Sequence, residues 1–305
     1  MTGGRVVIAG ATGFIGRALV RELAAGPYDI VALVRRDPSP PLPAGVVAAL
    51  WDGVTAGDWT RHVNGALAVI NVTGDNLARG RWTKAKKDRI LTSRTRPAEA
   101  LIKASLQAAS PPRVLIQASA VGYYGSPGET EVDESSPAGE GFLAGVVREW
   151  EASTVPFEAP GLRRAVVRSG LVLGRGGGVW PSLVRPFQFF AGGPIGDGRQ
   201  WFSWIALEDE ARAIRFLVER EDLAGAFNLT APRPLRQRDL CRTIGRALRR
   251  PCWLPVPACA LRLLFGGKAD ETLLVSQRVF PRRLVGAGFE FRYPDAAAAI
   301  AALVR

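Results

Sequence analysis

Three glycines at regular spacing follow an apolar run near the start of the chain. Gly10, Gly13 and Gly16 form a G-x-x-G-x-x-G turn directly after residues 6–9. The apolar residues behind the turn recur at helical spacing, which predicts a strand, a tight turn and an amphipathic helix. In such a unit the first glycine permits the turn, the second lets the backbone approach a pyrophosphate, and the third lets helix pack on strand. The turn therefore predicts a dinucleotide site, with a glycine-rich hairpin as the alternative interpretation.

Two arginines follow the next predicted strand, residues 30–34. A carboxylate at the position of Arg35 or Arg36 would bind the ribose 2′-hydroxyl of NAD, whereas arginine can pair with a 2′-phosphate. We therefore expect the cofactor to be NADP(H). The alternative is that both arginines are ordinary solvated charges at the end of a strand.

Composition limits the other functions. With 305 residues, 47% of them hydrophobic, the chain is long enough to bury an α/β core and a smaller lobe. Its net charge of +12 comes mostly from arginine, and no arginine-rich tract resembles a nucleic-acid module, so we expect no nucleic-acid partner. No apolar run approaches the roughly 20 residues of a membrane span, and a strand begins too early for a cleaved signal peptide. We expect a cytoplasmic protein that does not enter membranes.

Cysteine and histidine are too few and too scattered for a metal site. Cys241, Cys252 and Cys259 are odd in number and lack metal-ligand spacing, so we expect reduced, structural thiols. The sole histidine, His62, is expected on a surface helix. We therefore expect no bound metal.

The pattern of strands and helices predicts a Rossmann-type α/β fold. Apolar runs predict strands at residues 5–9, 30–34, 48–51, 67–72, 114–118, 165–172 and 226–229, and helical patterns occupy residues 83–108, 142–151 and 208–220. This alternation predicts a doubly wound parallel sheet. We expect a dinucleotide-binding domain at residues 1–175, to which residues 205–230 return. Residues 176–204 and 231–305 are expected to form a smaller, mainly helical substrate lobe.

Two glycine-rich stretches, residues 175–178 and 191–198, frame an aromatic-rich segment that contains Trp180, Phe187, Phe189, Phe190, Trp201, Phe202 and Trp204. Loops with this much glycine often cover a ligand site. Aromatic residues, however, fill protein cores more often than they bind ligands. Both interpretations of this segment stay open.

Several motifs together resemble the extended short-chain dehydrogenase/reductase superfamily. The motifs are residues 71–76 with 80–82, residues 119–125, residues 168–174, residues 192–194 with 198–205, and residues 227–232. They are similar to an atypical branch, the epimerase-family NADP-binding oxidoreductases, which end in a short C-terminal domain of unknown function. The resemblance covers nearly the whole chain and implies fold and cofactor more firmly than reaction.

The resemblance also implies which residues bind the cofactor. The pyrophosphate would lie on Gly10, Thr12, Gly13, Phe14, Ile15 and Gly16, and the 2′-phosphate on Arg35 and Arg36. Asp52 falls where the superfamily places an acid near adenine, although an exposed turn carboxylate is an equal alternative. The backbone of Val72, Thr73 and Gly74 would run beside the ribose of the cofactor. The nicotinamide would be flanked by Ala118, Ser119, Arg168, Ser169, Gly170 and Leu171.

The proton-transfer pair of the superfamily is missing. Typical members carry Tyr-x-x-x-Lys on a helix, but Phe142 and Val146 stand at those positions, and neither side chain can move a proton. Ser119 lies one residue before the usual hydroxyl position and is a candidate for hydrogen bonding on the cofactor side. Tyr123 and Tyr124 are the nearby phenols. A free phenol titrates near about 10, so one of them would need a cation as neighbour, such as Lys86 or Arg81.

The leading hypothesis is an NADP(H)-dependent oxidoreductase that acts on a small carbonyl or alcohol. Tyr123, Tyr124 and Ser119 are its catalytic candidates, and Trp82, Trp150, Arg199 and Trp201 are candidates for substrate contact. A non-catalytic NADP(H) sensor or partner-binding protein is the alternative, and a nucleotide-sugar epimerase is the third. Relatives often pair through two long helices, so the resemblance implies a homodimer through residues 96–108 and 142–151.

Overall fold

The computed structural model describes residues 3–37, 40–158 and 161–304. Within these ranges the chain forms two compact units. Unit 1 contains Met1–Ser119, Val146–Val167 and Ala211–Ala226, and unit 2 contains Ala120–Gly145, Arg168–Glu210 and Phe227–Arg305. Compactness therefore groups residues 120–145 and 168–175 with the C-terminal part of the chain, although we expected them in the first domain. The functional division at residue 175 stays a prediction.

A seven-stranded sheet organises unit 1. Its strands are β1 (Arg5–Ala9), β2 (Asp29–Val34), β3 (Val47–Leu50), β4 (Ala68–Asn71), β5 (Val114–Ala120), β7 (Arg163–Ser169) and β11 (Gly225–Leu229). The strand order is β11-β7-β5-β4-β1-β2-β3, and the pairs β1–β2, β1–β4, β2–β3 and β4–β5 are parallel. The order reverses between β1 and β4, where doubly wound sheets bind their ligands at the carboxyl ends of the strands. The predicted fold class is confirmed.

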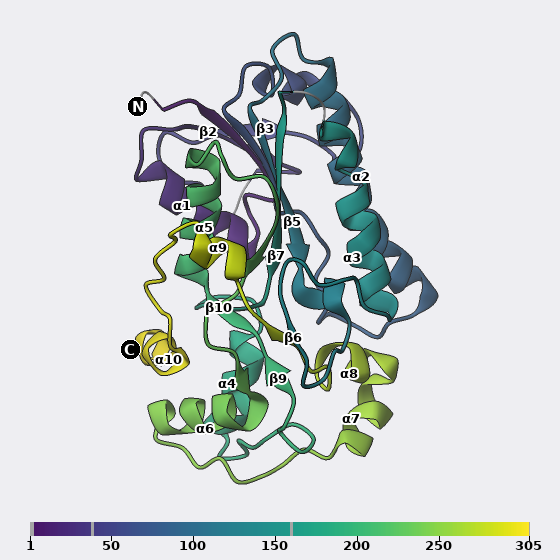
Figure 1. The fold of residues 1–305 in the computed structure, drawn as a ribbon, viewed down its shortest axis with the longest axis vertical. Helices are drawn as coiled ribbons and strands as arrows, with labels where there is room; N and C mark the ends of the chain where they lie inside the picture. Colours follow the sequence, from purple (N-terminus) through teal and green to yellow (C-terminus); the bar gives the residue numbers. More distant parts are fainter. Residues whose placement is uncertain (1–2, 38–39, 159–160, 305) are drawn as a thin grey trace. The chain divides into compact units, whose positions relative to one another are not determined.

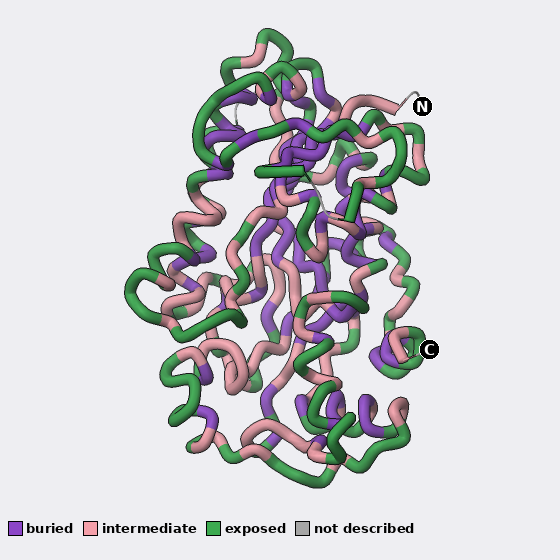
Figure 2. Tube along the Cα trace, turned by 180° about the vertical axis from the view of Figure 1, so that it is seen from behind, coloured by how far each residue is buried: buried purple, intermediate pink, exposed green. Residues whose placement is uncertain are grey.

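The central strands of the sheet are buried along almost their whole length, whereas the edge strand β3 is mostly exposed. Every residue of β4 and all but the first residue of β1 and β2 are buried, as expected of a parallel sheet covered on both faces. Figure 2 shows this burial as a continuous purple centre. The covering helices are α1 (Phe14–Ala24), α2 (Lys84–Gln107), α3 (Phe142–Ala152) and α5 (Leu207–Glu219). Figure 1 shows α2 and α3 on one side of the strands and α1 and α5 on the other.

Unit 2 consists of short strand pairs and helices. Its strands are β6 (Glu131–Val132), β8 (Leu171–Leu173), β9 (Trp201–Phe202), β10 (Trp204–Ala206), β12 (Leu235–Arg236) and β13 (Arg278–Val279). Its helices are α4 (Trp180–Gln188), α6 (Gln237–Leu248), α7 (Ala258–Phe265), α8 (Gly267–Thr272), α9 (Arg282–Gly286) and α10 (Ala296–Val304). The C-terminal part of the chain is therefore mainly helical, as predicted. Among the described residues, no helix is long and apolar enough to cross a membrane.

The aromatic-rich segment divides between core and surface. Trp180, Phe187 and Trp204 are buried in one hydrophobic cluster of unit 2, which supports the packing interpretation for them. Phe189 and Phe190, at the end of α4, are exposed. The sequence pattern alone could not separate these two groups.

The strand expected at residues 165–172 is interrupted at Gly170. β7 ends at Ser169, and β8 begins at Leu171. The Gly170 N–H donates to the Leu229 carbonyl at 3.0 Å, and a methyl group at Gly170 would lie 2.6 Å from the Ser203 carbonyl oxygen. The single-strand prediction was wrong because a backbone contact from a distant segment breaks the strand there.

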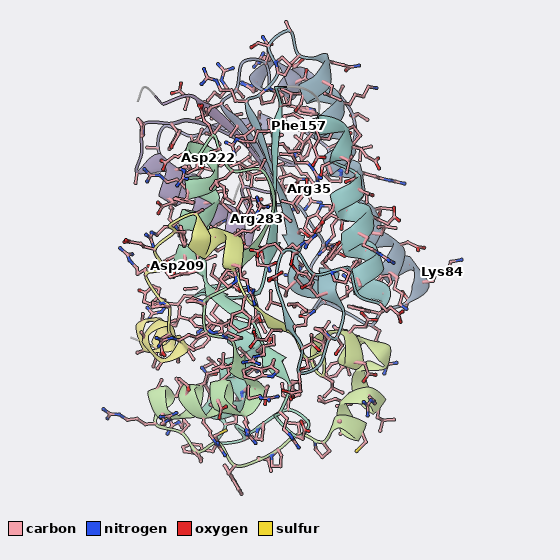
Figure 3. The ribbon with its side chains drawn as sticks, in the orientation of Figure 1. Arg35, Lys84, Phe157, Asp209, Asp222 and Arg283 are labelled. Atoms are coloured by element: carbon pink, nitrogen blue, oxygen red, sulfur yellow. The ribbon has the colours of Figure 1, made fainter. Side chains whose placement is uncertain are left out.

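The first turn of α5 holds a later segment of unit 2. The buried Asp209 carboxylate accepts hydrogen bonds from the Arg292 and Tyr293 N–H groups, each at 2.8 Å. We expect Asp209→Ala to destabilise the protein by about 1–3 kcal/mol, because two partly buried N–H groups lose their charged acceptor. Urea denaturation followed by tryptophan fluorescence measures this. Asp222, which is fully exposed beside Arg220 (Figure 3), supplies the control. An unchanged midpoint in Asp209→Ala, matching that of Asp222→Ala, would contradict the role of Asp209.

Candidate functional site

The glycine turn brings three backbone segments of unit 1 into contact. Gly10 has a φ of +86°, and a methyl group on it would lie 2.8 Å from the Val72 carbonyl. At Gly16 a methyl group would lie 2.1 Å from the Gly10 carbonyl oxygen. Gly13, by contrast, has only that oxygen within 4 Å of such a methyl group, at 3.1 Å. The turn is therefore closed on the sheet side and open at Gly13, as a phosphate cradle requires.

The start of α1 is suited to an anion. Gly13 is its N-cap, no side chain caps it, and its first turn carries no acidic residue, so its N–H groups and the positive end of the helix dipole are available. Arg17 lies in the same turn and donates to the carbonyls of Thr12 at 3.2 Å and Pro40 at 3.0 Å. Arg17 was missed by the sequence analysis, because nothing local indicates its contact with Pro40.

Arg35 and Arg36 are exposed directly after β2, and Figure 3 labels Arg35. In the described ranges, neither guanidinium is paired with a carboxylate. Asp52 is different, because it holds its own turn: its carboxylate accepts from the N–H groups of Val54 and Thr55 at 2.8 Å and from the Thr55 hydroxyl at 2.6 Å. The bonds from Thr55 are the main reason that the pKa of Asp52 is lowered to about 2. This geometry favours the turn-carboxylate interpretation, and contact with adenine stays a prediction.

Polar side chains fix the backbone after β4. The buried Asn71 amide oxygen accepts from the Thr73 N–H at 3.1 Å and from its hydroxyl at 2.6 Å, while the Asn71 amide nitrogen donates to Gln117 at 3.0 Å. Next along the chain, a methyl group at Gly74 would lie 3.2 Å from the Arg94 guanidinium carbon. Val72, Thr73 and Gly74 thus form a fixed edge beside the glycine turn, because Val72 contacts Gly10.

Arg94 links this edge to Trp150, a candidate for substrate contact. Its guanidinium donates to the Asp75 carbonyl at 3.2 Å and lies 5.1 Å from the centre of the Trp150 ring. Burial lowers the pKa of Arg94 to about 10, so it keeps its charge at neutral pH. Trp150 is only 6% exposed, so its position is that of a packed core residue. Trp82 is half-buried, and its indole N–H donates to the Leu77 carbonyl at 3.1 Å.

Ser119 is paired with a carboxylate that the sequence analysis missed. The Ser119 hydroxyl donates to the Glu151 carboxylate at 2.6 Å, and Ser119 is buried. Glu151 lies on α3, the helix on which the superfamily carries its tyrosine and lysine. The two residues are 32 positions apart in the chain, and no local pattern connects them. This pair is a hydroxyl and a carboxylate within proton-transfer distance of each other.

In unit 2, Arg168 is the cation beside the two phenols. Its guanidinium carbon lies 3.4 Å from the centre of the Tyr123 ring, and its Nη1 donates to the Tyr124 hydroxyl at 3.0 Å. The expected neighbours, Lys86 or Arg81, are therefore corrected to Arg168. Lys86 forms an ion pair with Asp75 at 2.6 Å.

Tyr124 is fully engaged, whereas Tyr123 is not. The Tyr124 hydroxyl donates to the Asn228 amide oxygen at 2.8 Å, and burial raises the pKa of Tyr124 to about 12. Tyr124 therefore stays protonated near neutral pH and fixes Arg168 rather than exchanging a proton. The Tyr123 hydroxyl has no hydrogen bond to any described residue, and the Tyr123 side chain is half-buried.

The end of β7 contacts a buried carboxyl on α5. The Ser169 hydroxyl lies 2.5 Å from one oxygen of Glu210, and the other oxygen is buried without a hydrogen-bond partner among the described residues. Burial raises the pKa of Glu210 to about 8. This carboxyl, which the sequence analysis also missed, is therefore largely protonated at pH 7.

Trp201 and Arg199 are brought together through Arg236. The Trp201 ring lies between two guanidinium groups, 4.1 Å from Arg236 and 4.6 Å from Arg278, and its indole N–H donates to Glu129 at 3.0 Å. Arg236 also donates to the Arg199 carbonyl. The hydrogen bonds from Arg236 and Trp201 lower the pKa of Glu129 to about 2. Of the four substrate candidates, Trp201 and Arg199 belong to unit 2, and Trp82 and Trp150 belong to unit 1.

The fold and the glycine turn together define a Rossmann-like α/β protein with a dinucleotide-type cradle. The family model for the NAD dependent epimerase/dehydratase family matches residues 6–230, and that for a domain of unknown function, DUF1731, matches residues 256–303. The chain belongs to the NAD dependent epimerase/dehydratase family. The resemblance drawn from the sequence motifs is confirmed.

Known relatives extend over nearly the whole chain. An epimerase family protein of Mycobacterium leprae is 39% identical over 288 residues, which are 94% of this chain and 92% of that protein. The crystal structure of human epimerase family protein SDR39U1 (isoform 2) with NADPH has a TM-score of 0.89 and 32% identity, and the match covers 98% of this chain and 99% of the human chain. An Arabidopsis thaliana relative, 38% identical over 98% of this chain and 86% of its own length, is named as chloroplastic. A cytoplasmic location therefore stays a prediction.

The buried Glu210 carboxyl generates a prediction about pH. A carboxyl whose folded-state pKa is about 8 instead of 4.5 binds its proton more tightly in the folded state. Its contribution to stability is therefore complete below its ordinary pKa and is lost as pH rises through 8. We expect the free energy of unfolding to fall between pH 5 and pH 9, and Glu210→Gln to flatten that slope. Urea titrations across this range measure it, with the exposed Glu208→Gln as control. An identical slope in Glu210→Gln would contradict the assignment.

Proposed function

We propose that the protein binds NADP(H) and acts as an oxidoreductase on a small carbonyl or alcohol substrate. The observation that carries the proposal is the NADPH in the crystal structure of the human relative, together with the glycine cradle of this chain. Two further features support it: the free N-terminus of α1, and two exposed arginines after β2. Each feature suits one end of a phosphorylated dinucleotide.

Different residues would bind different parts of the cofactor. Gly10 and residues 12–16 would hold the pyrophosphate with backbone N–H groups, and Arg35 with Arg36 would hold the 2′-phosphate. Residues 72–74 would lie beside the ribose of the cofactor. Ala118, Ser119 and residues 168–171 would flank the nicotinamide. When bound, NADPH supplies a hydride to the substrate. The other groups of the chain orient the substrate and handle its proton.

Tyr123 is the proposed proton donor in place of the missing pair on α3. Its hydroxyl is not hydrogen-bonded to a described residue, and the Arg168 guanidinium stacked at 3.4 Å holds its ring. Tyr124 acts as a positioning residue, because its hydroxyl joins Arg168 to Asn228. Ser119 and Glu151 form a second proton-exchanging pair. Trp82 of unit 1 and Arg199 and Trp201 of unit 2 stay candidates for substrate contact, whereas burial disfavours Trp150. Pairing of two copies through α2 and α3 stays a prediction.

The cofactor preference can be tested on the arginines. Removing both guanidinium groups in Arg35→Ala, Arg36→Ala eliminates charge-assisted hydrogen bonds, each worth about 1.5–3 kcal/mol. We expect the Kd for NADPH to rise about 10-fold to 100-fold, while the Kd for NADH stays within about twofold. Fluorescence titration of both nucleotides measures this, with Arg21→Ala, an exposed arginine on α1, as control. Equal weakening of both nucleotides would contradict a 2′-phosphate contact.

The proton donor can be tested with a phenol deletion. Tyr123→Phe keeps the ring under Arg168 but removes the hydroxyl, so we expect turnover to fall by about 100-fold to 10,000-fold with the Kd for NADPH unchanged. Stopped-flow oxidation of NADPH with the best substrate from a panel of aldehydes and ketones gives the rate. Tyr28→Phe removes a phenol hydroxyl bonded to Glu219 in unit 1 and serves as the matched control. Full turnover in Tyr123→Phe would exclude Tyr123 as donor.

A non-catalytic NADP(H) sensor is the second candidate, favoured by the apolar Phe142 and Val146 on α3. It predicts tight NADPH binding without oxidation by any compound of the panel. Turnover with any of them would exclude this candidate.

A further inference from the structure

A hollow lined by arginines lies in unit 2, outside the residues used above. It has a volume of about 490 Å³ and opens to solvent. Its walls come from the C-terminal half of α6 and the residues that follow it: Arg242, Gly245, Arg246, Arg249, Arg250 and Cys252. Arg242 and Arg246 are four residues apart on α6, so they project from one face of the helix, and Arg249 follows directly after its end. Four arginines therefore line one open space.

These arginines are not needed to cap the helix. The last carbonyls of α6 already accept hydrogen bonds from the backbone, since the Arg249 N–H donates to Arg246 and the Arg250 N–H donates to Gly245 at 2.8 Å. The usual reason for basic side chains at a helix C-terminus is thus satisfied by the main chain.

Most of the positive charge around the hollow is not neutralised. Arg242 lies 3.5 Å from Asp239, and the Arg250 guanidinium stacks on Phe190 at 4.2 Å. Arg246 and Arg249 form no ion pair with any carboxylate in the part of the chain that the structure describes. Like charges at this spacing repel one another, and a bound anion would relieve that repulsion.

The backbone is strained where it holds these side chains. Among the described residues other than glycine, only Phe190 and Arg249 have a positive φ, 57° and 54°. Arg249 lines this hollow, and the Phe190 ring is stacked by Arg250, which also lines it. Contacts hold both conformations: the Trp253 indole N–H donates to the Phe190 carbonyl at 2.9 Å, and Gly245 leaves room for the Arg250 carbonyl. Strained residues of this kind persist where the surrounding contacts enforce them and concentrate at ligand sites.

From these observations we propose that the hollow binds the phosphate group of an anionic ligand. The planar forks of guanidinium groups match phosphate oxygens, and the volume suits a small ligand. Phe189 and Trp253, which are 70% and 66% exposed, add apolar surface at the end of α4 and after α6. The phosphate would come from a soluble phosphorylated compound or from the headgroup of an anionic lipid.

The test uses the full chain and a variant that keeps the fold. Arg246→Gln, Arg249→Gly removes two charges, and glycine suits the left-handed conformation at residue 249, so folding is preserved. The control Arg21→Ala, Arg148→Ala removes two exposed charges from unit 1. Isothermal titration with sodium pyrophosphate gives the affinity. We expect the variant to bind about tenfold or more weakly and the control to bind within about twofold of the unmodified protein.

A second arm identifies the source of the phosphate. Co-sedimentation is measured with vesicles of phosphatidylglycerol and, for comparison, of phosphatidylcholine. Pyrophosphate binding that the variant loses indicates a soluble ligand. Binding to phosphatidylglycerol alone that the variant loses indicates a lipid headgroup. The proposal is overturned if neither probe binds, if the variant binds like the unmodified protein, or if the control loses as much as the variant. Pyrophosphate that binds at the glycine turn of unit 1 is lost in neither variant. The part of the binding that Arg246→Gln, Arg249→Gly removes therefore reports on the hollow, whether or not the protein binds NADPH.

Discussion

The contact between the backbones of β1, α1 and β4 is the constraint on which the cofactor region of unit 1 depends. Gly10 lies against Val72, and Gly16 lies against the Gly10 carbonyl, at distances that leave no space for a side chain. This contact fixes where α1 starts, and the start of α1 fixes where N–H groups are directed outward. β1 sits at the reversal of strand order, so the same contact places the cradle at the ligand edge of the sheet.

The loss of the tyrosine and lysine from α3 coincides with a different use of that helix. At its first turn, the Phe142 and Leu143 N–H groups donate to the two oxygens of Glu271, at 2.9 and 3.0 Å. Glu271 lies in the segment matched by DUF1731, so within unit 2 that segment caps the helix start. Further along α3, Glu151 binds Ser119. These polar contacts of α3 thus lie near its two ends. The candidate phenols, Tyr123 and Tyr124, lie outside this helix.

The sequence predicted what depends on local pattern and missed what depends on distant partners. Buried strands, amphipathic helices and the glycine turn follow from periodicity and from the conformational freedom of glycine. Apart from the strand that is broken at Gly170, they were found within one or two residues. The partner of Ser119 lies 32 positions beyond it in the chain, and the partner of Tyr124 lies 104 positions beyond it. The break at Gly170 is set by a carbonyl from residue 203. Only folding brings such groups together, so no local signal could have revealed them.

Arginine illustrates why net charge says little about function until partners are known. The Arg163 guanidinium donates hydrogen bonds to the carbonyls of Leu217, Val218 and Leu223, and its role is therefore structural. Arg168 is buried against two phenol rings. Guanidinium groups of these kinds contribute to the net charge of +12 without offering it to a ligand. What remains for recognition is the smaller set that is exposed and lacks a carboxylate partner among the described residues. Arg35 and Arg36 stand at the end of β2, and Arg246 and Arg249 border one hollow. We therefore expect anion binding to depend on the positions of these groups rather than on the total charge. An arginine that already donates to acceptors within the protein attracts a ligand anion only weakly.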